Sequence, residues 1–142
     1  MGKCDDIGSE VADGAESKSV GQCLKYVRRG IQRALGLSEQ PIGIESAKDA
    51  GPWLTKVGFE KMSISDYQDG DVIVVDADAN HKHGHIEVKY GSKWYSDFEQ
   101  NTPYPWKNAV FKGKYRYKEV KLTSGFGTFG GGLGYASYGN RW

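Results

Sequence analysis

The stretch that decides the fold is residues 21–36, GQCLKYVRRGIQRALG. Its apolar side chains recur at the spacing of one buried helical face: Leu24, Val27, Ile31 and Leu35. We expect Ser19 to cap this helix at its start, because a serine hydroxyl can accept from the free backbone N–H groups there. We expect Gly36 to end it. The pattern therefore predicts an amphipathic helix whose first turn carries Cys23.

A second segment, residues 84–98, has the alternation of an antiparallel hairpin. One strand face holds Ile86, Val88 and Tyr90, and the other holds His85, Glu87 and Lys89. The dipeptide Gly91-Ser92 then turns the chain, and residues 93–98 return it.

Other segments complete the expected order of elements. Residues 46–57 predict a second helix that Ser46 caps, and residues 72–75, VIVV, predict a buried strand. Residues 110–122 predict one or two further strands. Because helices come first and antiparallel strands follow, the sequence predicts an α+β fold.

The composition suits one domain of 142 residues without disulfide staples. The net charge of +1 gives no reason to expect a nucleic-acid partner. Residues 1–14 lack the apolar run of a signal peptide or membrane anchor. We therefore expect a monomer that is made in the cytoplasm, does not insert into membranes, and reaches any external target through other machinery.

Three regions are expected along the chain. Residues 1–16 are polar and aperiodic, and predict a loosely held N-terminal arm. Residues 17–122 predict the folded domain. Residues 123–142 are rich in glycine and predict a flexible tail, since such a segment buries too little surface to order itself. Its aromatic residues leave open a docking or targeting peptide.

Cys23 is the candidate nucleophile. The aligned backbone dipoles at a helix N-terminus favour a thiolate, which is the reactive form of cysteine. Two other interpretations are a buried core cysteine and a disulfide with Cys4.

His85 is the candidate base, because it starts a rigid strand after a glycine that leaves room for a substrate. A metal site is the alternative, and its ligands would be drawn from His81, His83, His85, Asp76 and Asp78. Gly84 and the loop character of this segment argue against one preformed ligand face. We expect no metal and no cofactor.

A third residue should orient the imidazole by accepting its other N–H. The returning strand and the residues after it offer four candidates: Ser96, Asp97, Glu99 and Asn101. A two-residue turn would set Phe98 opposite His85, whereas a three-residue turn would put Asp97 on the histidine's face. We prefer Asp97, because an isolated carboxylate beside Phe98 is costly unless it is paired.

Four segments, in the family's order, resemble the CHAP family of cysteine amidohydrolases and peptidases, within the NlpC/P60-like, papain-like superfamily. These segments are residues 21–27, 69–74, 84–88 and 96–101. The resemblance covers about residues 17–122. It implies a papain-like α+β fold in which the helix that carries the cysteine packs on the antiparallel sheet that carries the histidine.

The resemblance also implies the roles of single residues. Cys23 would be the nucleophile and His85 the base. The acidic third member would fall on Asp97 or Glu99, with Asn101 as a further member. Gln22 and the Cys23 amide would form the oxyanion hole. The hairpin is shorter than the family's usual one, which leaves the third member open.

Two functions of different classes follow. The first is a bacteriolytic peptidoglycan hydrolase, either an amidase or an endopeptidase, that acts as a phage lysis protein or as an injected antibacterial effector. Its partners would be the peptidoglycan substrate and a cognate inhibitor or delivery protein, and it would act on the cell wall or in the periplasm. The alternative is a non-catalytic phage tail or virion component, or a binding module, on the same fold.

Overall fold

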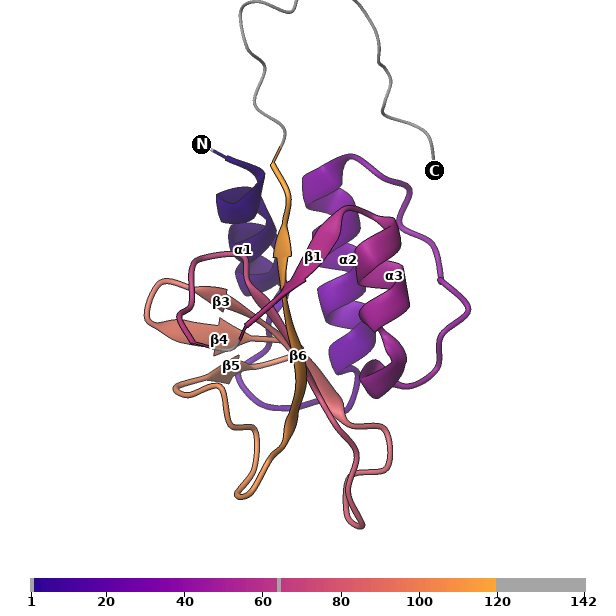
Figure 1. The fold of residues 1–142 in the computed structure, drawn as a ribbon, viewed down its shortest axis with the longest axis vertical. Coiled ribbons are helices and arrows are strands. Elements are labelled where there is room, and N and C mark those ends of the chain that lie inside the picture. Colours follow the sequence, from indigo (N-terminus) through magenta and orange to yellow (C-terminus); the bar gives the residue numbers. More distant parts are fainter. Residues whose placement is uncertain (1, 64, 120–142) are drawn as a thin grey trace, which may run out of the picture.

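A computed structural model describes residues 2–63 and 65–119 of this chain. An antiparallel sheet of six strands has the order β1-β6-β2-β3-β4-β5 (Figure 1). The elements are α1 (Lys3–Gly14), α2 (Cys23–Leu35), the 3-10 helix η1 (Ala47–Asp49), α3 (Gly51–Lys56), β1 (Phe59–Met62), β2 (Val72–Val75), β3 (His85–Tyr90), β4 (Lys93–Tyr95), β5 (Glu99–Gln100) and β6 (Phe111–Tyr117). The predicted α+β class is confirmed. The predicted tail, residues 123–142, lies outside the described residues.

Helix α2 forms where the apolar spacing predicts it. Val27 and Ile31 are fully buried, and Gly36 ends the helix with a left-handed φ of 73°. The expectation for Ser19 is wrong. Gln22 occupies the N-cap position without a side-chain hydrogen bond, and the Ser19 hydroxyl instead donates to Asp97, 3.3 Å away.

Helix α1 replaces the loosely held arm that the sequence was expected to form. Ile7 and Val11 lie one turn apart, and both are buried in the core against α2. Gly30 permits this close packing, since a Cβ there would lie 2.5 Å from a methyl carbon of Val11. The arm interpretation was wrong because two buried residues are enough to dock a helix whose other positions are polar.

The segment after residue 46 is less regular than the expected single helix. Pro52 lies in the first turn of α3, where its missing N–H costs no intrahelical bond. Helix η1 precedes it, and β1, which was not predicted, follows it.

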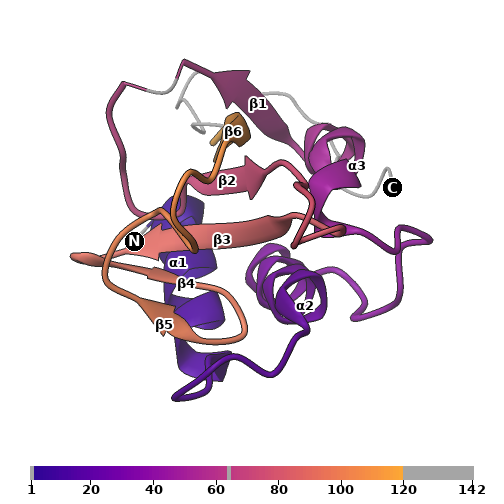
Figure 2. The same ribbon diagram turned by 90° about the horizontal axis from the view of Figure 1, so that it is seen from below.

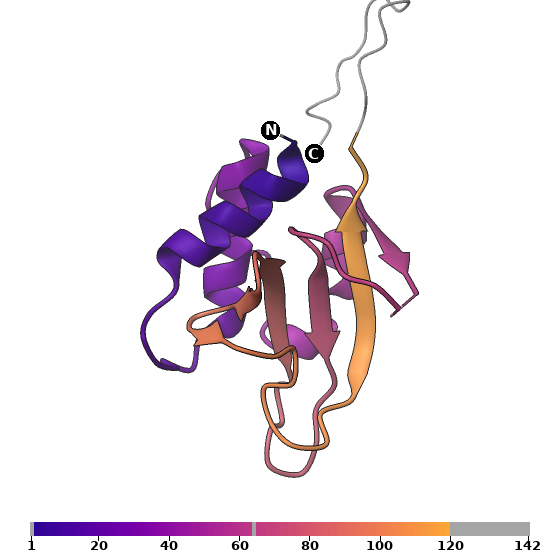
Figure 3. The ribbon, with the colours of Figure 1, turned by 90° about the vertical axis from the view of Figure 1, so that its left-hand side faces the viewer.

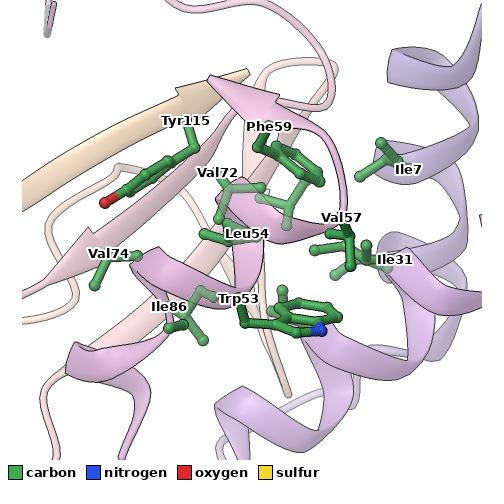
Figure 4. Close-up of a cluster of buried hydrophobic side chains, with 14 of the residues drawn as sticks. Ile7, Ile31, Trp53, Leu54, Val57, Phe59, Val72, Val74, Ile86 and Tyr115 are labelled. Carbon is green, nitrogen blue, oxygen red and sulfur yellow. The ribbon is translucent and has the colours of Figure 1, made fainter. Parts of the chain in front are cut away.

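The core lies mainly between the sheet and the helices. Strand residues of one face join helical residues in this core, and Figure 4 labels members from both: Ile7, Ile31, Trp53, Leu54, Val57, Phe59, Val72, Val74, Ile86 and Tyr115. The alternate residues Ile73 and Val75 face the other side, where they pack with Trp94. Strand β2 is therefore buried on both faces, as its unbroken apolar run predicts.

Helices α1 and α2 lie side by side on one face of the sheet (Figures 2 and 3). The loop that joins them brings the start of α2 to the end of the sheet where β3 begins. In the part of the chain that the structure describes, no helix is both long and apolar enough to cross a membrane.

A buried ionic network joins β2 to β6. Asp71 is fully buried, and its two carboxylate oxygens accept from Arg116 Nε and Nη2 at 2.8 and 2.9 Å. The backbone N–H of Gln68 also donates to Asp71, at 2.8 Å. The buried Lys114 ammonium lies 3.8 Å from the same carboxylate. Removal of the charge at Asp71 would leave Lys114 and Arg116 with only the exposed carboxylate of Asp66, which lies 3.7 Å from each.

We expect Asp71→Asn to lower the free energy of unfolding by about 3–5 kcal/mol, because a broken buried ion pair leaves an uncompensated charge. Urea denaturation followed by circular dichroism measures this loss. Glu39→Gln is the control, since Glu39 forms an exposed ion pair with Arg33. Equal midpoints for the two variants would contradict the role assigned to Asp71.

Candidate active site

The loop before Cys23 is fastened to the sheet by Asp97, which is 1% exposed. One carboxylate oxygen of Asp97 accepts from the backbone N–H of Val20 at 2.8 Å and from that of Gln22 at 3.2 Å. The Ser19 hydroxyl donates to the same oxygen. The Asp97 carbonyl accepts from Glu16 N–H at 2.8 Å. These bonds fix the path of the chain immediately before Cys23.

The electrostatics of Asp97 agree with this role. Burial raises the pKa of this carboxyl, but the amides of Val20 and Gln22 and the Ser96 hydroxyl outweigh burial and hold the pKa below its usual range. Asp97 is therefore a carboxylate at neutral pH, and its charge strengthens each bond to the loop.

Cys23 and His85 meet at the start of α2 and β3. Cys23 occupies the first turn of α2 and is partly buried, whereas His85 is the first residue of β3 and is 6% exposed. Both side chains line the same cavity, and Cys23 is close enough to raise the pKa of His85. The structure therefore brings together the two residues that the sequence analysis singled out.

The far side of the imidazole is held by Gln100 and Glu87. His85 Nε2 lies 2.8 Å from Gln100 Oε1 and 3.3 Å from Glu87 Oε1. The Gln100 amide nitrogen donates to Glu87 at 2.9 Å and to the Thr102 carbonyl at 3.1 Å, which leaves the amide oxygen to accept from Nε2–H. This arrangement leaves Nδ1 as the nitrogen that faces Cys23.

The ionisation of His85 depends on these neighbours. Burial lowers its pKa, but the hydrogen bonds with Cys23 and Glu87 outweigh burial and raise the pKa to about 10. Burial raises the pKa of Glu87, and the hydrogen bonds from His85 and Gln100 oppose that rise. Because the two groups are in contact, they titrate as a coupled pair.

The hairpin register differs from the preferred expectation. Tyr90 pairs with Lys93 and Val88 pairs with Tyr95, so Gly91-Ser92 is a two-residue turn and the three-residue turn is wrong. Asp97 therefore does not reach the imidazole as expected; its carboxylate bonds the loop before Cys23. One residue of register decides which face a strand side chain occupies.

Of the other three candidates for the third residue, Ser96 donates its hydroxyl to Asp97 at 3.1 Å, and Glu99 and Asn101 lie on either side of Gln100. Since alternate strand residues face opposite ways, Glu99 and Asn101 face away from the side that Gln100 occupies. Glu99 pairs with Lys93 instead. The sequence analysis missed Glu87 and Gln100. Glu87 could have been found from the strand alternation, which already places it on the face of His85.

The other histidines have separate partners. His81 Nδ1 lies 2.8 Å from an Asp78 carboxylate oxygen, and its ring stacks on Trp106 with centroids 3.7 Å apart. His83 Nδ1 lies 2.6 Å from the Ser46 hydroxyl. Within residues 2–63 and 65–119, no three His, Cys, Asp or Glu side chains form a group that could hold a metal ion.

A groove passes through Cys23. A cavity of about 710 Å³ lies on the side of α2 and residues 41–45, and a cavity of about 490 Å³ lies on the side of His85 and Trp106. Both cavities are lined by Gly21, Cys23 and His83. An extended substrate can therefore occupy both sides of the sulfur. Gln22, proposed from the resemblance as an oxyanion group, lines the larger cavity.

Comparison with solved structures identifies relatives of this fold. The type VI native effector–immunity complex Tae3–Tai3 from Ralstonia pickettii contains a chain with a TM-score of 0.69 and 35% sequence identity, and the match covers 83% of this chain and 100% of that one. The chain belongs to the Tae3 family. The selenomethionine form of the same complex gives a TM-score of 0.65 at 34% identity, over 78% of this chain and 98% of the other.

No protein-family model matches the sequence, and no curated protein is significantly similar to it. Membership of the Tae3 family therefore rests on the solved structures, which match nearly their whole length.

NMR titration of the imidazole can show which neighbouring carboxyl group raises the pKa of His85 in this Tae3 family member. We expect wild-type His85 to remain protonated at pH 8, because its pKa is raised to about 10. Glu87→Gln should lower that pKa by about 1–3 units, since it removes an adjacent negative charge. Asp97→Asn should leave the pKa unchanged. A shift in Asp97→Asn without one in Glu87→Gln would restore Asp97 as the orienting acid.

The raised pKa of His85 also makes the free energy of unfolding depend on pH. A raised pKa means that the folded state holds the proton more tightly than the unfolded chain does. The stabilisation is therefore complete below the ordinary histidine pKa of 6.5 and is lost as the pH rises toward 10. Glu87→Gln should flatten this pH dependence in urea denaturation, and an unchanged slope would contradict the coupling.

Proposed function

We propose that this chain is an antibacterial effector that hydrolyses an amide bond of peptidoglycan, as an amidase or endopeptidase. The observation that carries the proposal is the placement of Cys23 and His85 on the wall of one cavity, with a second cavity adjoining at Cys23, in a fold shared with Tae3. A cysteine at a helix start, close to a histidine that a further group orients, is the arrangement of an activated nucleophile.

The reaction would proceed by acyl transfer. The sulfur of Cys23, paired with the protonated His85, attacks the carbonyl carbon of the scissile amide as a thiolate. The tetrahedral intermediate collapses, the imidazolium gives its proton to the leaving amine, and a thioester remains on Cys23. Water, deprotonated by the now neutral His85, then attacks the thioester, which releases the acid and restores the thiolate–imidazolium pair.

The supporting groups divide into two sets. Gln100 accepts from His85 Nε2–H, which keeps Nδ1 directed at the sulfur, and Glu87 stabilises the imidazolium that forms. Asp97 acts on the other partner, because it holds the loop before Cys23. Gln22 and the Cys23 amide are proposed as the oxyanion donors, since both lie at the start of α2 beside the sulfur.

The CHAP-like segments give this proposal independent support, because two of them contain Cys23 and His85. The Ralstonia relative is a type VI effector in complex with its immunity protein, which favours an injected effector over a phage lysis protein. We accordingly propose that the protein acts on the wall of a target cell after delivery, and that its partners include a cognate immunity protein. No observation favours the non-catalytic alternative.

Cys23→Ala and Cys23→Ser should each reduce the release of fragments from purified peptidoglycan by at least about a thousandfold, as loss of a nucleophile does. Cys4→Ala is the matched control and should retain activity. Burial first, and then Glu119, raise the pKa of Cys4 to about 12, so its thiol is inert. Circular dichroism of each variant confirms folding.

Activity in folded Cys23→Ala would overturn the nucleophile assignment. Mass spectrometry of the wild-type digest identifies the cleaved bond from the new termini. No release by the wild type from any wall chemotype would move the assignment to the non-catalytic alternative.

The histidines provide a test of the base against a metal site. His85→Ala should abolish hydrolysis, whereas His81→Ala and His83→Ala should retain most of it, because these rings bond Asp78 and Ser46 rather than Cys23. Chelator should not inhibit the wild type. Equal losses at the three histidines, reversed by added zinc, would replace the cysteine mechanism with a metal mechanism.

A further inference from the structure

Arg28 lines the larger cavity together with Cys23. Its Nη1 donates to the Gln32 side chain at 2.9 Å and to the Gln40 carbonyl at 2.8 Å. Among residues 2–63 and 65–119, no further hydrogen bond and no carboxylate partner is found for its guanidinium. The parallel N–H donors on Nε and Nη2 are therefore available to a ligand, and this pair matches the two oxygens of a carboxylate.

The two other arginines of α2, unlike Arg28, each form an ion pair with Glu39. Arg29 lies 4.0 Å from Glu39, and Arg33 forms a 2.8 Å ion pair with the same carboxylate. Arg28 is more buried than Arg29, and it lacks such a partner in the described chain. Burial, followed by repulsion from Arg29, lowers the pKa of Arg28, and attraction to Glu39 opposes this shift.

The charged side chains that line the larger cavity are mostly cationic, which favours an anionic ligand. Its lining includes the cations Lys25 and Arg28 and one acid, the exposed Glu45. Lys25 adds an exposed ammonium near the mouth, whereas Arg28 offers a fixed fork within the cavity. This combination favours a negatively charged segment of substrate on the α2 side of Cys23.

We propose that Arg28 binds a free carboxylate of the peptide substrate in the larger cavity and so selects the bond that Cys23 attacks. The inference rests on the proposed hydrolysis of a peptidoglycan amide. Arg28 lies five residues after Cys23 on the helix, a rise of about 7.5 Å.

The test uses synthetic stem peptides in which one carboxylate at a time is replaced by a carboxamide. Binding to Cys23→Ala protein is measured by calorimetry, and kcat/KM is measured with protein that retains Cys23. Amidation of one particular carboxylate should weaken both by about 10- to 100-fold, the loss expected for a bidentate charged bond. Arg28→Gln should cause the same loss on the unmodified peptide, and Arg28→Lys should restore only part of it.

The decisive comparison combines the Arg28→Gln variant with the amidated peptide. Arg28→Gln should lose nothing further on the amidated peptide, which also shows that the variant is folded. Arg29→Gln is the matched control and should respond to amidation as the wild type does. If the losses from Arg28→Gln and amidation multiply for every carboxylate, Arg28 binds none of them and the inference fails while the hydrolase proposal stands. If no peptide or sacculus is hydrolysed, the hydrolase proposal fails, and calorimetry alone decides the role of Arg28.

Discussion

The buried carboxylate of Asp97 is the constraint on which the site depends. A carboxylate that is 1% exposed is costly unless donors surround it, and here the donors include the Ser19 hydroxyl and the backbone amides of Val20 and Gln22. The charge therefore ties the end of the hairpin to the chain that leads into α2. Because His85 lies on the same sheet, this tie fixes Cys23 relative to His85.

Two separate polar networks meet at the Cys23–His85 contact. Asp97 positions the cysteine side, and Glu87 with Gln100 positions the histidine side. Each network is buried and contains a carboxyl group, but their effects differ: one fixes a backbone path, and the other sets the tautomer and the pKa of a ring. The groove is then open on both sides of the sulfur, as cleavage within a chain of amides requires.

The strongly periodic elements, α2 and β3, could be predicted from the sequence, and so could the meeting of Cys23 and His85. The partner of the imidazole could not, because it depends on one residue of hairpin register. Gln100 was missed for a related reason: its approach to His85 requires β5 to pair beside β4, which no local pattern specifies. Helix α1 was missed because its burial is tertiary and rests on Ile7 and Val11.

The central claim is that the fold makes one of two free thiols a nucleophile. Alkylation with limiting iodoacetamide, followed by peptide mass spectrometry and a hydrolysis assay on the same samples, tests it most directly. The account predicts that the reagent modifies Cys23 before Cys4, and that peptidoglycan hydrolysis falls in proportion to Cys23 modification. Undiminished hydrolysis by protein that is fully alkylated at Cys23 would contradict it.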